Sequence, residues 1–142
     1  MSVTFEDVLA ARERIAGGVV VTPCGESPAL SELTGCRVFP KAEYLQRTGS
    51  FKERGARNAL LLLSDTQKKT GVVAASAGNH ALALAFHGRD LGIPVTVVMP
   101  KVAPIIKQSR CRALGAKVLL YGDNIGEAKD LADQLVASEG FA

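Results

Sequence analysis

A lysine beside the start of a predicted helix is the first residue that could do chemistry. In residues 48–55, Ser50 and Glu53 have the S-x-x-E spacing of a capping box, so a helix is expected from Ser50 to about Ser64. Lys52 would lie in the first turn, where the positive end of the helix dipole disfavours an ammonium group. This placement favours a neutral amine that can attack a carbonyl, as a Schiff-base lysine does. A solvated lysine that tolerates the unfavourable electrostatics is the alternative interpretation.

The second candidate is the polar loop at residues 75–80, between the carboxyl end of a predicted strand and the start of a predicted helix. Open α/β sheets bind ligands at this place, and free N–H groups at a helix start can hold an anion. The loop has neither the G-x-G-x-x-G of a dinucleotide fold nor the G-K-[ST] ending of a P-loop. A loop that only caps its helix, with Asn79 as N-cap, is the alternative. His80 is interpreted as a core or supporting residue, and His87 as a surface residue of the same helix.

Alternating strands and helices in the second half of the chain must position these two motifs. Continuous apolar runs separated by helices favour parallel βαβ units with right-handed crossovers. The predicted fold class is therefore α/β, an open parallel sheet flanked by helices. Pro40 reduces the run at 37–43 to an edge or interrupted strand. Helices are expected at 4–17, 27–34, 50–64, 79–91, 103–114 and 124–138, and strands at 37–43, 71–75, 94–99 and 117–121.

Composition narrows the classes of function. The chain has 142 residues, 47% of them hydrophobic, which suits one domain with a substantial core. Its net charge of +3 comes from scattered basic residues with few aromatics, which does not support nucleic-acid binding. No apolar run approaches the length of a membrane span, and the first residues lack a signal-peptide core. Three cysteines without C-x-x-C spacing indicate no metal site or disulfide framework, so a reducing, cytoplasmic location is expected.

Taken together, the motifs resemble one branch of a known enzyme family. From about Thr22 to the last helix, the chain is similar to the threonine/serine dehydratase (threonine ammonia-lyase) branch of fold-type II pyridoxal-phosphate enzymes. The resemblance implies the small domain of the tryptophan synthase β-like architecture. It is carried by Lys41, Glu43, Gln46, the Thr48–Lys52 run with Arg54 and Gly55, the Ser76–His80 loop, Val98-Met99-Pro100, Pro104, Lys107 and Gly115-Ala116.

The resemblance implies roles for particular residues. Lys52 would form the Schiff base with pyridoxal phosphate and then act as base for the Cα proton of the substrate. Phe51 would pack near the cofactor, and Asn79 would hydrogen-bond its phenolic oxygen. The reaction would be β-elimination of L-threonine or L-serine to a 2-oxo acid and ammonia. The loop that receives the substrate carboxylate would consist of Ser76, Ala77, Gly78, Asn79 and His80.

Two positions depart from the family pattern. Ala77 stands where the related serine racemases carry a serine used as a second base, and an alanine cannot move a proton. Racemisation by that route is therefore not expected. Leu82 stands where many relatives have glutamine, a difference to which we assign no consequence.

The family resemblance also implies a domain division. Members are longer than 142 residues, so residues 1–50 are expected to belong partly to a large domain and residues 51–142 to form the small α/β domain. Most of the large domain, with the glycine-rich loop for the cofactor phosphate, would lie beyond Ala142. The chain would then be a fragment, whose activity alone is left open. The full-length protein is expected to be a homo-oligomer in amino-acid metabolism, with isoleucine biosynthesis as the expected pathway.

Two alternatives stay open. One is a different fold-type II activity, either serine racemisation or β-replacement; Phe51 in the Ser-Phe-Lys element speaks against β-replacement. Another is a stand-alone small domain without catalysis, which would bind a carboxylate ligand or a partner subunit. The expected ligand in the leading interpretation is a small amino acid, with no metal, nucleic acid or membrane involved.

Overall fold

A three-stranded parallel sheet forms the centre of the fold. The computed structural model describes residues 2–142. Strands β1 (Val72–Ala75), β2 (Val95–Met99) and β3 (Lys117–Leu120) are arranged in that order, with Val72 opposite Val95 and Thr96 opposite Lys117. The three strands lie within the predicted runs, and the α/β class with an open parallel sheet is confirmed. The strand predicted at 37–43 is wrong, because these residues do not join the sheet and the chain turns into a short 3₁₀ helix instead.

Seven α-helices and one 3₁₀ helix occupy the described residues. Six of the α-helices correspond to predicted ones, whereas α4 was not predicted. Polar caps begin several of them: Thr4 and Asp7 form a capping box at α1, and Ser64 and Gln67 form another at α4. The helices are α1 (Phe5–Arg14), α2 (Pro28–Thr34), η1 (Glu43–Leu45), α3 (Lys52–Leu62), α4 (Asp65–Thr70), α5 (Asn79–Leu91), α6 (Ile105–Ala113) and α7 (Ile125–Glu139).

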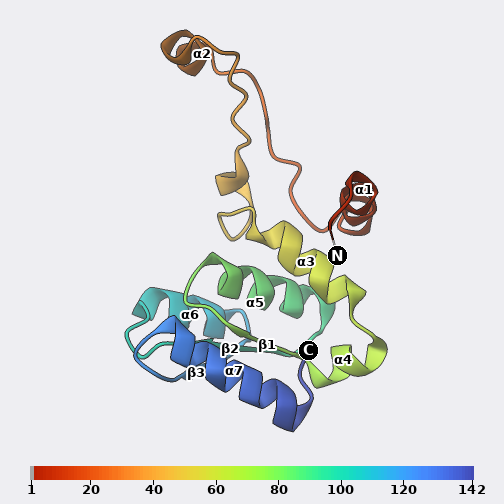
Figure 1. The fold of residues 1–142 in the computed structure, drawn as a ribbon, viewed down its shortest axis with the longest axis vertical. Coiled ribbons are helices and arrows are strands. Elements are labelled where there is room, and N and C mark those ends of the chain that lie inside the picture. The colour runs from red at the N-terminus through yellow and green to blue at the C-terminus, as the bar shows by residue number, and fades with distance from the viewer. Residues whose placement is uncertain (1) are drawn as a thin grey trace.

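Helices cover both faces of the sheet (Figure 1). On one face lie α5 and α6, the crossovers that connect consecutive parallel strands, and α3 packs on α5. The core on this side includes Leu60, Leu82 and Met99, which are fully buried. Each such side chain stabilises the fold by ~1.5–3 kcal/mol through loss of exposed apolar surface. On the other face α7 packs through Ala128 and Ala132 against β2.

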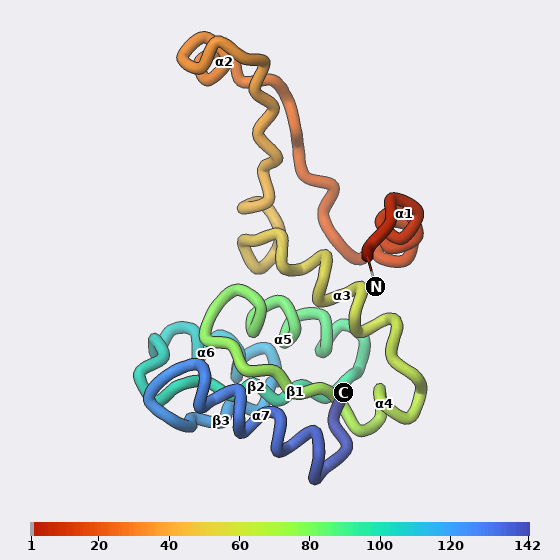
Figure 2. Tube along the Cα trace, in the orientation of Figure 1, coloured from red at the N-terminus to blue at the C-terminus, as the bar shows by residue number. Residues whose placement is uncertain are grey.

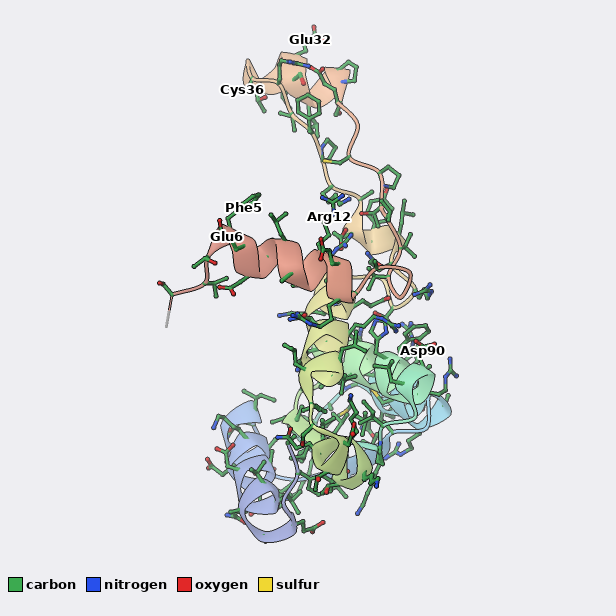
Figure 3. The ribbon with its side chains drawn as sticks, turned by 90° about the vertical axis from the view of Figure 1, so that its right-hand side faces the viewer. Phe5, Glu6, Arg12, Glu32, Cys36 and Asp90 are labelled. Atoms are coloured by element: carbon green, nitrogen blue, oxygen red, sulfur yellow. The ribbon has the colours of Figure 1, made fainter. Side chains whose placement is uncertain are left out.

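The chain between α1 and α3 forms an arm that projects from the body and carries α2 at its tip (Figure 2). Glu32 and Cys36 lie at the far end of this arm, whereas Asp90 lies on the body (Figure 3). Large apolar side chains on the arm are exposed, Val21 by 90% and Leu33 by 81%. These apolar side chains of the arm are not part of a hydrophobic core within residues 2–142. The division at residue 50 into parts of two domains stays a prediction.

Candidate active site

The helix that carries Lys52 starts one residue later than a Ser50 cap requires. Phe51 already has helical angles, φ −60° and ψ −14°, and Lys52 is the first residue of α3. Ser50 Oγ accepts the Lys52 N–H at 3.4 Å, but the Glu53 carboxylate accepts the N–H of Thr48 and not that of Ser50. The predicted capping box is therefore wrong. Its glutamate is fully buried under the turn and is held there by a different donor.

The Lys52 amine is available for chemistry. Its side chain is exposed, and Nζ lies 5.0 Å from the centroid of the Phe51 ring. Within residues 2–142 no carboxylate forms an ion pair with it. The amine is near the second motif, since α3 packs on α5 and the charge of Lys52 is the second cause, after burial, that lowers the pKa of His80. The structure thus brings Lys52 and the loop at 75–80 to the same place.

An ion pair holds α3 to the segment before it. Arg54 Nη2 and Nε donate to Glu43 Oε1 and Oε2 at 2.8 Å and 2.9 Å, and Thr22 Oγ1 donates to the same carboxylate at 2.6 Å. Such bidentate, charge-assisted bonds fix geometry as well as adding energy. The hydrogen bond from Arg54 lowers the pKa of Glu43 to about 2, against the opposing effect of burial.

Two further motif residues complete this scaffold. The buried Gln46 side chain accepts the N–H of Val20 at 3.0 Å and donates to its carbonyl at 2.9 Å, so it replaces a strand neighbour. Lys41 Nζ donates to the Thr22 carbonyl at 2.6 Å. Sequence reasoning assigned no role to these residues. In the structure they join the segment at Val20 and Thr22 to the residues that precede the Lys52 turn. Their closeness in sequence to Glu43, the partner of Arg54, could have indicated this supporting role.

The loop after β1 presents free N–H groups at the start of α5. Ser76 Oγ accepts the N–H groups of Gly78 and Ala81, each at 3.3 Å, so the side chain that caps this helix belongs to Ser76. The predicted helix at 79–91 is confirmed; Asn79 is its first residue and not the N-cap that the alternative interpretation made it. Within residues 2–142 the N–H groups of Asn79 and His80 have no acceptor. Together with the helix dipole they form an anion site.

Gly78 of the loop and Lys107 of a neighbouring helix define the space over this loop. A Cβ placed on Gly78 would meet no atom within 4 Å, so the loop faces open space there. The exposed Asn79 side chain accepts from Lys107 Nζ of α6 at 3.2 Å. A cation from a third element therefore lies at the edge of the anion site.

His87 does not lie on the surface, contrary to the sequence prediction. Its side chain is fully buried where α3 packs on α5, and Nε2 lies 3.6 Å from Glu53 Oε2. The prediction failed because α5 is surrounded by apolar neighbours on most sides. Even a polar residue on it is enclosed.

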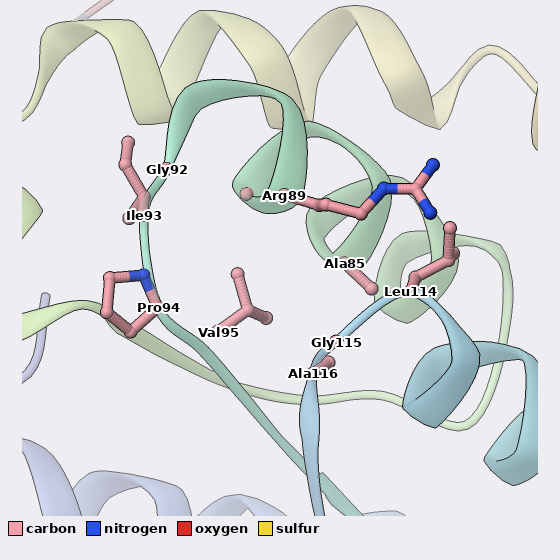
Figure 4. A pocket seen from close by; sticks show the side chains of 10 residues that line it. Ala85, Arg89, Gly92, Ile93, Pro94, Val95, Leu114, Gly115 and Ala116 are labelled. Carbon is pink, nitrogen blue, oxygen red and sulfur yellow. The ribbon is translucent and has the colours of Figure 1, made fainter.

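Two cavities lie elsewhere. One of about 200 Å³ is found at the amino ends of β2 and β3, at the opposite edge of the sheet from the Ser76 loop, with Arg89 and Leu114 at its wall (Figure 4). The other, of about 740 Å³, lies between α1 and α3 and is lined mainly by apolar side chains, among them Val8 and Ile15. Neither of these two cavities includes Lys52 or a residue of the Ser76–His80 loop.

No helix among residues 2–142 is both long and apolar enough to cross a bilayer. In the same residues no group of three His, Cys, Asp or Glu side chains could hold a metal ion.

Several known proteins are similar to this chain in sequence or in structure. Residues 15–142 match the protein family described as pyridoxal-phosphate dependent enzyme. The chain is 44% identical over 138 residues to an L-threonine ammonia-lyase of Thermotoga maritima, which covers 97% of this chain and 34% of the relative. It is 45% identical over 136 residues to an L-threo-3-hydroxyaspartate ammonia-lyase of a Pseudomonas species, which covers 96% of this chain and 42% of that protein.

A solved structure agrees with the sequence matches. Maize serine racemase superposes with a TM-score of 0.92 at 31% identity, over 100% of this chain and 43% of the racemase chain. The present chain thus spans less than half the length of each of these three proteins.

Proposed function

This chain belongs to the family of pyridoxal-phosphate-dependent enzymes, and on that premise we propose a specific reaction for the full-length protein that contains it. The reaction is β-elimination of L-threonine or L-serine to a 2-oxo acid and ammonia, with Lys52 as the Schiff-base lysine. The observation that carries the proposal is the juxtaposition of the unpaired Lys52 amine with the free N–H groups at the start of α5. The name of the Thermotoga relative supports threonine as substrate.

The residues present fit one side of the cofactor. An amine without an ion-pair partner suits its aldehyde, the exposed Asn79 amide suits its phenolic oxygen, and the exposed Phe51 ring beside Nζ offers an apolar contact. When bound, the cofactor supplies an electron sink for the carbanion at Cα. We place the residues that hold its phosphate and ring nitrogen outside residues 1–142.

The side chains and amides of this chain would divide the remaining tasks. The N–H groups of Asn79 and His80 bind the substrate carboxylate and fix the orientation of the Cα–H bond. The Lys52 amine accepts the Cα proton. Because its pKa is lowered, His80 is neutral at physiological pH and adds no positive charge to the site. Ala77 can neither donate nor accept a proton, which argues against the racemase alternative.

A second candidate substrate is L-threo-3-hydroxyaspartate. It differs from threonine by a second carboxylate, and the Lys107 ammonium lies at the edge of the anion site, 3.2 Å from Asn79 Oδ1. The name of the Pseudomonas relative points to the same substrate. Competition between threonine and 3-hydroxyaspartate, measured as the ratio of kcat/KM values, decides between them. A Lys107→Met variant should lower kcat/KM for 3-hydroxyaspartate alone if that is the substrate.

The test of the proposed reaction compares two lysine variants of the full-length protein. Lys52→Ala should lose both the visible absorbance of lysine-bound pyridoxal phosphate and the release of 2-oxo acid from threonine. Lys101→Ala is the matched control, since this exposed lysine only approaches Asp123 at 3.9 Å and should leave both signals intact. Retention of both signals in Lys52→Ala contradicts the assignment. Release of ammonia from threonine without a co-substrate excludes β-replacement.

We also propose that the full-length protein is a cytoplasmic homo-oligomer. With threonine as substrate the product would be 2-oxobutanoate, which places isoleucine biosynthesis among the pathways it could supply. Light scattering of the full-length protein tests whether it is a homo-oligomer.

A further inference from the structure

A buried cluster of charged and polar side chains lies behind the lysine turn, away from the open side of the site. Glu53 and His87 are each fully buried, and Thr48 is 6% exposed. Within residues 2–142, four buried side-chain atoms have no hydrogen-bond partner, and all four belong to this cluster. They are Thr48 Oγ1, Glu53 Oε2, Arg57 Nε and His87 Nε2. Buried polar atoms are almost always paired, so a concentration at one place requires an explanation.

The contacts determine which ring nitrogen of His87 carries the proton. Arg57 Nη1 lies 3.3 Å from His87 Nδ1, and a guanidinium can only donate, so Nδ1 is the acceptor. The proton of the neutral ring is then on Nε2, which faces Glu53 Oε2 at 3.6 Å. Burial is the main cause of the lowered pKa of His87, in agreement with a neutral ring. Glu53 and Arg57 of α3 face this ring.

Other groups close the cluster from the side of α5 and the loop before α3. Asp90 accepts from Arg57 Nη1 at 2.5 Å and holds that guanidinium in place. Phe86 meets the His87 ring edge-on at 5.0 Å, and the Arg47 guanidinium lies 5.6 Å from the Phe86 centroid. The position of His87 is thus fixed from both helices.

The same cluster connects the two halves of the candidate site. Glu53 follows Lys52 directly, and its carboxylate accepts the N–H of Thr48, so it closes the turn that leads into α3. His87 belongs to α5, the helix whose first residues present the free N–H groups. The contact between Glu53 and His87 therefore joins the lysine turn to the helix that carries the anion site.

We propose that Glu53 and His87 are positioning residues that hold Lys52 at a fixed offset from the N–H groups of Asn79 and His80. The inference rests on the proposed function, which gives that offset its purpose. A role in stability alone does not account for the pair, because buried polar atoms without hydrogen-bond partners cost free energy. A small displacement of a reacting group, in contrast, costs on the order of 100-fold in rate.

The experiment uses the full-length protein with three single variants. His87→Leu removes the donor that faces Glu53. His87→Gln keeps a donor toward Glu53 and an acceptor toward Arg57, so it should rescue the function. Cys111→Ala opens a small space at a fully buried position of α6, outside the site, and serves as the control for destabilisation.

The first measurement is hydrogen exchange of residues 48–53 without cofactor. His87→Leu should accelerate exchange there about 10-fold or more relative to wild type, whereas His87→Gln and Cys111→Ala should stay within about 3-fold. The second measurement is steady-state kinetics with threonine, in which His87→Leu should lower kcat about 10- to 100-fold with little change in KM. Equal effects of His87→Leu and Cys111→Ala on both measurements would overturn the proposal.

A fourth variant protects the test against misfolding of His87→Leu. Glu53→Gln keeps the acceptor for Thr48 but turns an amide donor toward the Nε2 proton, so two donors oppose each other. It should show the same local acceleration of exchange, and unchanged exchange would also overturn the proposal. The exchange data need neither cofactor nor activity, so failure of the proposed reaction, seen with Lys52→Ala, is distinguishable from failure of this inference.

Discussion

Arg54 and Glu43 form a bidentate ion pair with N–O distances of 2.8 Å and 2.9 Å. The pair joins η1, which begins at Glu43, to α3, the helix that carries Lys52. The pair is only partly exposed, by 33% on the arginine side and 17% on the glutamate side. Arg54 lies two positions after Lys52, the Schiff-base lysine of our proposal. Arg54 lines the cavity between α1 and α3, which includes neither Lys52 nor a residue of the Ser76–His80 loop.

The depressed pKa of Glu43 predicts how stability depends on pH. A carboxylate whose pKa is about 2 in the folded protein, against 4.5 ordinarily, contributes stability that is present above pH 4.5 and lost as the pH falls toward 2. Glu43→Gln should therefore lower the free energy of unfolding at pH 7 by on the order of 2 kcal/mol, with a smaller difference at pH 3. Denaturant titrations across this range measure it. Glu26→Gln, which breaks the exposed pair with Arg37, is the control and should change stability by less than about 1 kcal/mol.

A glycine beside Arg57 offers an independent way to disturb the buried cluster. A Cβ on Gly18 would lie 1.6 Å from Arg57 Nε, so Gly18→Ala must push the guanidinium away from His87 and Asp90. We expect a loss of about 1–3 kcal/mol in the free energy of unfolding. Gly25→Ala is the control, since nothing lies within 4 Å of its Cβ position, and thermal unfolding of both variants gives the comparison. Equal stability of the two variants contradicts the packing described for Arg57.

Ser76 should matter for substrate binding as well as for its helix. Ser76→Ala removes the acceptor for two N–H groups, which costs about 1 kcal/mol of stability and loosens the loop that holds the substrate carboxylate. KM for threonine should rise about 10-fold, more than kcat falls. Ser64→Ala removes a comparable cap from α4 and should cost similar stability without a change in KM. An unchanged KM in Ser76→Ala would show that the loop does not bind the substrate.

Much of the sheet could be predicted because burial on both faces gives a strong signal. The strand β2 is apolar except at Thr96, and α5 contains an unbroken apolar run at residues 81–86, so the limits of both elements were predicted within a residue. The arm was predicted less well. Pro40 and the lack of a neighbouring strand leave residues 37–42 outside the sheet, and η1 begins at Glu43. Helix α4 has no apolar periodicity and was missed, although its capping box, S-x-x-Q from Ser64, is visible in the sequence.

The residues proposed to bind cofactor and substrate were identified from the sequence, whereas the buried residues behind them were not. Lys52 and the Ser76 loop come together as expected, but the burial of Glu53 and His87 was not foreseen. A signal was present for each. Glu53, Ala56 and Leu60 form a helical stripe with i, i+3, i+7 spacing, and all three are buried. His87 continues a similar stripe from Leu84 of α5, so helical spacing already indicated an enclosed polar pair.

The central claim is that Lys52 is the amine that holds the cofactor, and one measurement addresses it directly. The full-length protein is incubated with pyridoxal phosphate, reduced with borohydride and digested, and the modified peptide is identified by mass spectrometry. We predict that one lysine per chain is modified and that it is Lys52. Stoichiometric modification of a different lysine, such as Lys107, with Lys52 unmodified in an active protein, would contradict it.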